Sequence, residues 1–215
     1  MRRFRDRRDA GRRLAERLTA YTGSDVIVLG LPRGGVPVAA EVARALGAPL
    51  DIVVVRKLGV PWQPEVAMGA IGEGGVRVVD SRIVSRAGID DETLRDVEIR
   101  ERAVLDDRVR VWRAVRQRAD VRGRTAVVVD DGIATGSTAR AACRVLREAG
   151  AERVVLAAPV APRDVVDDLA EADEVVVVHA PRDFSAVGQF YDDFAATSDD
   201  EVVALLRQLG GAAAP

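Results

Sequence analysis

The chain has 215 residues, of which 48% are hydrophobic and 31% charged, a composition that excludes disorder as a description of the whole chain. One cysteine, Cys143, and one histidine, His179, exclude an internal disulfide and a zinc site of the usual kind. The net charge of −2 argues against general nucleic-acid binding, and no apolar run is long enough to span a membrane. At about 150 residues per domain, one domain over residues 1–215 is expected, and the charged N-terminus lacks the apolar core of a secretory signal, which predicts a cytoplasmic protein.

Helix-like and strand-like segments alternate along the chain. The expected helices cover residues 4–21, 36–47, 91–117, 138–149, 162–171 and 199–209, and the expected strands cover residues 25–30, 50–55, 76–80, 125–129, 153–159 and 174–179. Strands that alternate with crossover helices form a parallel sheet, so the pattern predicts an α/β protein. Residues 60–75 are rich in glycine and proline and are expected to be a long loop with at most one short strand. Residues 210–215 are expected to be a loose tail.

Two of the expected helices allow a second interpretation. Residues 1–20 carry eight arginines against three acidic residues, whereas residues 151–215 carry thirteen acidic residues against four arginines. The first helix is therefore expected to lie in an acidic neighbourhood, with a nucleic-acid-binding arm as the alternative. The long helix over residues 91–117 is expected to pack on the core, with a homodimer contact as the alternative.

The segment VVVDDGIATGSTAR, residues 127–140, carries the strongest functional signal. An apolar strand ends in Asp130 and Asp131, and a turn of small and hydroxyl residues leads into a helix. Backbone N–H groups in such a turn bind anions, whereas the two carboxylates suit sugar hydroxyls or a divalent cation. The segment therefore favours a ligand with a phosphate near a diol, such as a ribose 5-phosphate. The alternative is a carboxylate pair at a strand end followed by a simple helix cap.

A single lysine, Lys57, stands among the 32 basic residues of the chain. Because arginine supplies every other positive charge, this lysine indicates a site that needs a compact ammonium group rather than a planar guanidinium. It follows Arg56, directly after the second expected strand.

Residues 127–140 resemble the 5-phosphoribosyl-1-pyrophosphate (PRPP) signature of the type I phosphoribosyltransferases. The segment LPRGGV at residues 31–36 matches the pyrophosphate loop of that family. The segments RKLG at residues 56–59 and PEVAMGAIGEGG at residues 64–75 are similar to a bacterial subgroup of unassigned acceptor. The resemblance covers about residues 25–180. It implies a five-stranded parallel sheet flanked by helices, a flexible lid loop at residues 60–75 and a small hood, expected within the C-terminal segment 180–209.

The resemblance also implies roles for individual residues. Asp130 and Asp131 would contact the ribose hydroxyls, directly or through Mg²⁺ and water. The 5-phosphate would bind to the turn formed by Ile133, Ala134, Thr135, Gly136, Ser137 and Thr138. The pyrophosphate would bind to Arg33, Gly34, Arg56 and Lys57, often beside a cis peptide bond in this family. Asp130, Asp131, Arg33 and Lys57 would be catalytic, because positive charge near the leaving group and carboxylates near the ribose stabilise the transition state.

The implied reaction is the Mg²⁺-dependent transfer of the 5-phosphoribosyl group from PRPP to a nitrogenous base or related acceptor, with release of pyrophosphate. The partners are therefore PRPP and a small-molecule acceptor. Ala134 stands where the oxopurine branch carries a third carboxylate, which argues against hypoxanthine or guanine and leaves the acceptor open. The alternative is a regulatory protein that binds PRPP or a nucleotide and kept the fold without the transferase activity.

Three further features allow two interpretations each. His179 would contact a base or form a structural hydrogen bond. Trp62 and Glu65 would contact an acceptor or remain exposed. Four aromatic residues would stack on a base or dock the C-terminal segment on the core, and they are Phe184, Phe190, Tyr191 and Phe194.

Overall fold

The computed structural model describes residues 3–209, so the expected tail at residues 210–215 lies outside the described residues. Its central feature is a five-stranded sheet in the order β2-β1-β6-β7-β8, in which every neighbouring pair is parallel. The strands are β1 (Val26–Gly30), β2 (Leu50–Ile52), β6 (Thr125–Val129), β7 (Arg153–Val160) and β8 (Glu174–His179). This confirms the predicted α/β class.

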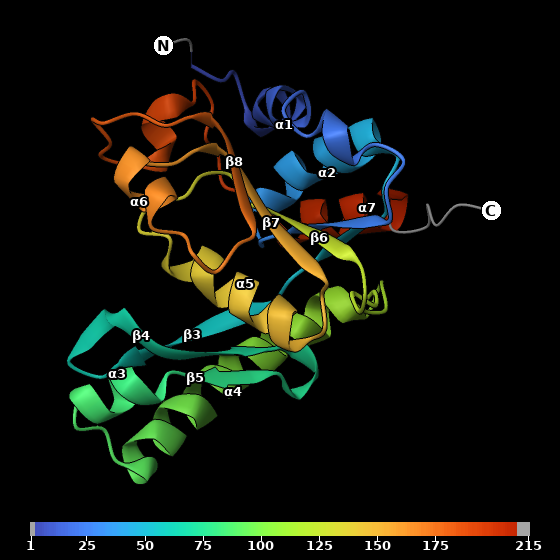
Figure 1. Cartoon of the computed structure of the whole chain (residues 1–215). Coiled ribbons are helices and arrows are strands. Elements are labelled where there is room, and N and C mark those ends of the chain that lie inside the picture. Colours follow the sequence, from blue (N-terminus) through green and yellow to red (C-terminus); the bar gives the residue numbers. More distant parts are fainter. Residues whose placement is uncertain (1–2, 210–215) are drawn as a thin grey trace.

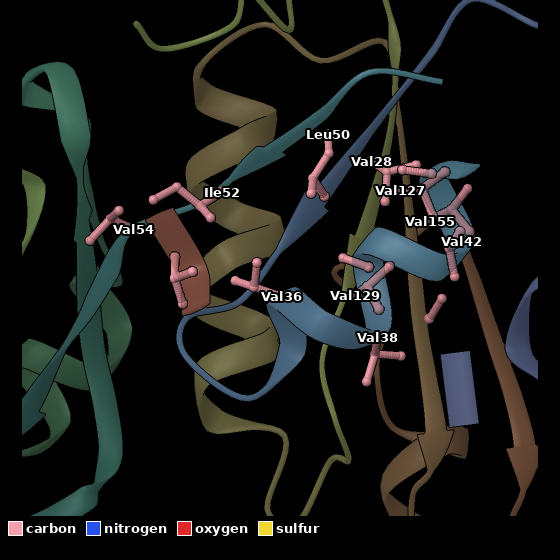
Figure 2. Packing of buried hydrophobic residues seen from close by; sticks show 14 of the residues in the cluster. Val28, Val36, Val38, Val42, Leu50, Ile52, Val54, Val127, Val129 and Val155 are labelled. Carbon is pink, nitrogen blue, oxygen red and sulfur yellow. The ribbon is translucent and has the colours of Figure 1, made fainter. Parts of the chain in front are cut away.

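Helices cover both faces of the large sheet (Figure 1). One face packs against α1 (Arg7–Ala15), α2 (Gly35–Leu46) and α7 (Asp199–Leu209), and the other against α5 (Ser137–Glu148) and α6 (Arg163–Asp167). Alternate residues of each strand point to opposite faces, so Val127 and Val129 join the first core and Ala126 and Val128 the second. Figure 2 shows the valines of α2 against those of the strands.

A second, three-stranded antiparallel sheet corrects the expectation of a loop at residues 60–75. It contains β3 (Val55–Val60), β4 (Gln63–Gly72) and β5 (Arg77–Val79), in the order β3-β4-β5. The glycines that suggested a loop are used for close backbone approach instead. A Cβ added to Gly59 would lie 2.6 Å from the carbonyl oxygen of Pro64. A Cβ added to Gly69 would lie 2.5 Å from the carbonyl oxygen of Val78.

Two helices pack with the small sheet, α3 (Ser81–Arg86) and α4 (Asp91–Arg113). We call the small sheet and these two helices the second unit. The sequence pattern did not predict α3, although Asp80 caps it through the backbone N–H groups of Arg82 and Ile83. The helix expected over residues 4–21 was too long. Asp6 caps α1, a short 3₁₀ turn follows at Thr19–Tyr21, and Phe4 pairs with the backbone of Tyr191 instead. The helix expected over residues 162–171 ends early, at Asp167.

A buried ion-pair network joins the two sheets. Asp51 of β2 is fully buried and accepts hydrogen bonds from Arg113 Nη1 at 2.7 Å and from the backbone N–H of Ala119 at 2.8 Å. The Nε of Arg113 donates to Glu73 at 2.7 Å. Burial alone would lower the pKa of Arg113, but the two carboxylates outweigh it and hold the pKa above its ordinary value. The end of α4 is thereby fixed to both sheets.

No helix within the described range, residues 3–209, has the length and apolar character needed to cross a membrane.

Replacing Arg113 with alanine should destabilise the fold strongly. The substitution leaves Asp51 buried without its charged partner, which typically costs about 3–5 kcal/mol. The free energy of unfolding in urea measures the effect. Arg110→Ala is the matched control, because Arg110 and its partner Asp107 are both mostly exposed and their pair should contribute less than about 1 kcal/mol. Equal losses in the two variants would contradict the role given to the buried network.

Candidate functional site

The two segments with the strongest functional signal lie side by side in the structure. Residues 31–35 follow β1 and residues 130–136 follow β6, and these two strands are parallel neighbours. Their carboxyl ends therefore open at one edge of the sheet, where α/β proteins bind ligands. The backbone N–H of Leu31 donates to the Val129 carbonyl at 2.8 Å, which ties the two segments together.

Two glycines permit this contact. An added Cβ at Gly34 would overlap the carboxylate of Asp131, and one at Gly35 would lie 2.5 Å from the Val129 carbonyl oxygen. The peptide bond between Pro32 and Arg33 is cis, in the loop where the family resemblance implied a cis bond at Arg33 and Gly34. The loop after β1 therefore lies directly against the carboxylate pair that follows β6.

The turn after β6 presents hydrogen-bond donors that the protein does not use. Within residues 3–209, the backbone N–H groups of Ala134 and Thr135 donate no hydrogen bond, and the buried Oγ of Ser137 has no partner. Gly136 adopts a left-handed conformation with φ of 75° and begins α5. Unused donors at a helix N-terminus form an anion site. The backbone N–H of Ile133 differs, because it donates to the Val160 carbonyl at 2.9 Å.

The two carboxylates after β6 lie in different environments. Asp130 is the more buried one, and burial followed by the charge of Asp131 raises its pKa to about 8. Its Oδ1 accepts the backbone N–H of Asp131 at 2.9 Å. Burial also raises the pKa of Asp131, but the guanidinium of Arg7 opposes this effect from 2.8 Å. Asp131 is therefore the member of the pair that carries the charge more readily.

Tyr191 and Arg7 are contacts of this pair that the sequence did not reveal. The hydroxyl of Tyr191 donates to the backbone carbonyl of Asp131 at 2.6 Å, and the side chain is buried. Burial, and then the nearby charge of Asp131, raises the pKa of Tyr191 well above its ordinary value, so the hydroxyl keeps its proton. The arginine-rich composition of residues 1–20 was the available signal for Arg7, but a charge count does not select one arginine among eight.

Two of the predicted cationic residues, Arg56 and Lys57, line a cavity of about 530 Å³ between the two sheets, whereas Arg33 does not. Its lining includes Pro32 of the loop after β1, Thr138 of α5, and both Arg56 and Lys57, which lie on β3. The structure therefore brings Arg56 and Lys57 to the same cavity as the loop after β1 and the first turn of α5, whereas residues 130–136 are not among its lining. Arg33 is half exposed, with Nη1 3.9 Å from the Asp199 carboxylate.

Arg56 and Lys57 each form an ion pair with a carboxylate. Arg56 contacts Glu101 of α4 at 2.5 Å, and the Nζ of Lys57 lies 3.3 Å from Glu65 of β4. Glu65 and Trp62 are mostly exposed at the end of the β3–β4 hairpin. Arg100, Arg108 and Trp112 of α4 also line the cavity, although the sequence analysis did not identify them. In the part of the chain that the structure describes, the buried indole N–H of Trp112 has no hydrogen-bond partner.

The structure resolves the neighbourhood of the N-terminal arginines. Arg3, Arg7 and Arg12 contact Asp192, Asp131 and Glu41, respectively, which confirms the acidic neighbourhood for these three side chains. It does not test the alternative of a nucleic-acid-binding arm.

His179 and the aromatic residues near the C-terminus contact the N-terminal segment. The Nε2 of His179 lies 2.9 Å from Nη2 of Arg13, and its ring is 5.2 Å from that of Phe4. Tyr191 packs on Phe4 and Phe194, whereas Phe184 stacks on Phe190. These contacts dock the C-terminal segment on the core, and a base-stacking role for the same rings stays a prediction.

The residues present fit a magnesium ion held with its substrate. No cluster of three or more potential metal-ligating side chains occurs among the residues that the structure describes, so a cage made of protein alone is absent from that part of the chain. Mg²⁺ is usually held by one or two carboxylates together with substrate oxygens and water. Asp130 and Asp131 supply such a pair beside the unused hydrogen-bond donors of the turn.

Comparison with known proteins decides the family. The phosphoribosyl transferase domain family matches residues 5–194. The chain belongs to the phosphoribosyl transferase domain family. Its five-stranded parallel sheet with a small antiparallel sheet is the type I phosphoribosyltransferase fold, which confirms the fold that the signature at residues 127–140 predicted.

Two Mycobacterium tuberculosis proteins, "Putative phosphoribosyl transferase Rv0571c" from strain H37Rv and "Putative phosphoribosyl transferase MT0597" from strain CDC 1551, are each 56% identical to this phosphoribosyl transferase domain over 207 residues. The match covers 96% of this chain and 47% of each relative, so the chain spans about half the length of these curated relatives. The crystal structure of TT1426 from Thermus thermophilus has a TM-score of 0.91 and 47% identity, covering 98% of this chain and all of that one.

The stability of the fold should fall as the pH rises toward 8. The pKa of Asp130 is raised from an ordinary value of 3.8 to about 8, so its contribution is fully present below 3.8 and is lost as the pH rises through about 8. Urea unfolding between pH 5 and pH 8, without Mg²⁺, measures this decline. Asp130→Asn should flatten it, whereas Asp106→Asn, on the exposed side of α4, should retain it. An unchanged pH dependence in Asp130→Asn would contradict the burial argument.

Proposed function

We propose that this chain transfers the 5-phosphoribosyl group of PRPP to a nitrogenous acceptor in the presence of Mg²⁺ and releases pyrophosphate. The observation that carries the proposal is the turn after β6, where Ser137 Oγ and two backbone N–H groups have no partner within residues 3–209 and adjoin the carboxylates of Asp130 and Asp131. Hydrogen-bond donors suit the phosphate of a ribose 5-phosphate, and the neighbouring carboxylates suit its ribose hydroxyls. Membership of the family supports the same substrate.

Each part of the site takes one part of PRPP in this proposal. Residues 133–138 bind the 5-phosphate, and Asp130 and Asp131 bind the ribose hydroxyls. Arg33, Gly34, Arg56 and Lys57 bind the pyrophosphate, since their segments meet at the cavity between the sheets or adjoin it. Mg²⁺, held through water by the two aspartates, supplies positive charge to the pyrophosphate oxygens when it is bound.

The reaction exchanges one bond at the anomeric carbon for another. The bond from this carbon to the pyrophosphate oxygen breaks, and a bond to the acceptor nitrogen forms. Negative charge grows on the pyrophosphate while the ribose ring gains oxocarbenium character. Cationic side chains at the leaving group therefore stabilise the transition state more than the bound substrate.

Lys57 and Arg56 would change partners during this cycle. Glu65 and Glu101 hold them in the structure, and the incoming pyrophosphate offers oxygens of higher charge. Glu65 lies in the β3–β4 hairpin, so pyrophosphate that draws Lys57 away would release this contact of the hairpin. We place the lid, which excludes water from PRPP, at the exposed end of this hairpin, residues 61–66, rather than over all of residues 60–75, because residues 68–72 are buried in the central strand of the small sheet.

The activity is tested by measuring pyrophosphate release from PRPP and Mg²⁺ across a panel of purines, pyrimidines and related heterocycles. The proposal predicts release that depends on both Mg²⁺ and one acceptor of the panel. PRPP binding without release for any acceptor would favour the alternative, a PRPP-binding regulatory protein.

Lys57→Ala should lower kcat more than it lowers the affinity for PRPP. A cation that acts on the developing charge of the leaving group contributes mainly in the transition state, and removing such a group typically costs about 10²-fold in rate. Turnover with the acceptor found above and equilibrium binding of PRPP provide the two measurements. Arg82→Ala is the control, because it removes a positive charge from a side chain of the same unit that is 95% exposed. Equal losses in kcat and affinity would contradict the leaving-group role.

A further inference from the structure

Arg7 makes a contact with the carboxylate pair that no sequence motif of this chain indicates. It lies in the first turn of α1, 124 residues before Asp131. Its Nε and Nη2 are each 2.8 Å from Oδ2 of Asp131. The side chains are only 12% and 15% exposed, respectively, so solvent screens this pair little.

The guanidinium of Arg7 is fixed on two further sides. Nη1 donates to the backbone carbonyl of Ala195 at 2.6 Å, and the guanidinium carbon lies 4.0 Å from the centroid of the Phe194 ring. A planar fork with several donors can make these contacts at once, whereas an ammonium group cannot. Arg7 therefore links α1, the C-terminal segment and the turn after β6.

Asp131 is held on its backbone as well as on its side chain. Tyr191 donates to its backbone carbonyl, and its carboxylate packs so closely on Gly34 that a Cβ there would overlap it. Arg7 donates to Oδ2 of Asp131, and the carboxyl group of Asp130 also forms a side-chain hydrogen bond with Asp131. The protein thus fixes the position of this carboxylate from two sides.

We propose that Arg7 is a positioning residue of the ribose site, which holds the carboxylate of Asp131 in place to receive a ribose hydroxyl of PRPP. The inference rests on the proposed function, because it needs PRPP to bind at this turn. Arg7 itself does not touch the ligand and acts through the carboxylate of Asp131. The N-terminal helix is thereby part of the substrate site, although it precedes the first strand of the sheet.

A double-mutant cycle tests this dependence. The dissociation constant of PRPP, in the presence of Mg²⁺, is measured for the full chain and for Arg7→Gln, Asp131→Asn and the double variant. We expect Arg7→Gln and Asp131→Asn each to weaken binding about tenfold, the scale of one charge-assisted hydrogen bond. The double variant should bind no more weakly than Asp131→Asn, because Arg7 has no carboxylate left to position.

Arg8→Gln is the matched control. Arg8 is the next residue of the same helix, is exposed, and has no ion-pair or hydrogen-bond partner among the described residues. Its replacement removes the same charge and should leave the PRPP affinity at the wild-type value. The thermal midpoint of every variant shows whether it folds, and if Arg7→Gln does not fold, Arg7→Lys replaces it under the same criteria.

Four results separate the possibilities. Wild-type affinity in a folded Arg7 variant would overturn the inference, and tighter binding would show instead that Arg7 competes with the ligand. Losses that multiply in the double variant would mean that Arg7 acts independently of Asp131, which also overturns it. If neither the wild-type chain nor Arg8→Gln binds PRPP, the proposed function fails and not only the role of Arg7.

Discussion

The packing of the loop after β1 against the turn after β6 fixes the geometry on which the rest of the site depends. Gly34 and Gly35 let the loop backbone reach Asp131 and the end of β6, at positions where any Cβ would collide. The strands bring the segments to one sheet edge, and this contact, together with the hydrogen bond from Leu31 to Val129, sets their separation. A ligand that spans a phosphate site and a pyrophosphate site needs that separation held constant.

The small sheet and α4 supply the positive charge that lines the cavity next to the loop after β1. Arg113, buried between Asp51 and Glu73, fixes α4 and the small sheet relative to the large one. Arg56 and Lys57 project from β3 into the same cavity that the loop after β1 reaches. Their carboxylate partners, Glu101 and Glu65, hold these two cations in place in the structure.

Local patterns predicted most of the large sheet and the turn that links β6 to α5. The strands β6 and β8 and the helix α7 begin and end at the predicted residues, because apolar β-branched runs and terminal caps are local signals. The β3–β4 hairpin was missed because its glycines serve close packing against neighbouring strands, which composition does not distinguish from a turn. The contact between Arg7 and Asp131 could not be predicted, since it joins residues 124 positions apart through the tertiary fold.

A crystal structure of the protein with PRPP and Mg²⁺ tests the central claim most directly. The account predicts the 5-phosphate within hydrogen-bond distance of Ser137 Oγ and the backbone N–H groups of Ala134 and Thr135. It also predicts the ribose hydroxyls at Asp130 and Asp131, with the pyrophosphate near Lys57. PRPP bound elsewhere on the molecule, or a turn that stays empty at saturating PRPP, would contradict it.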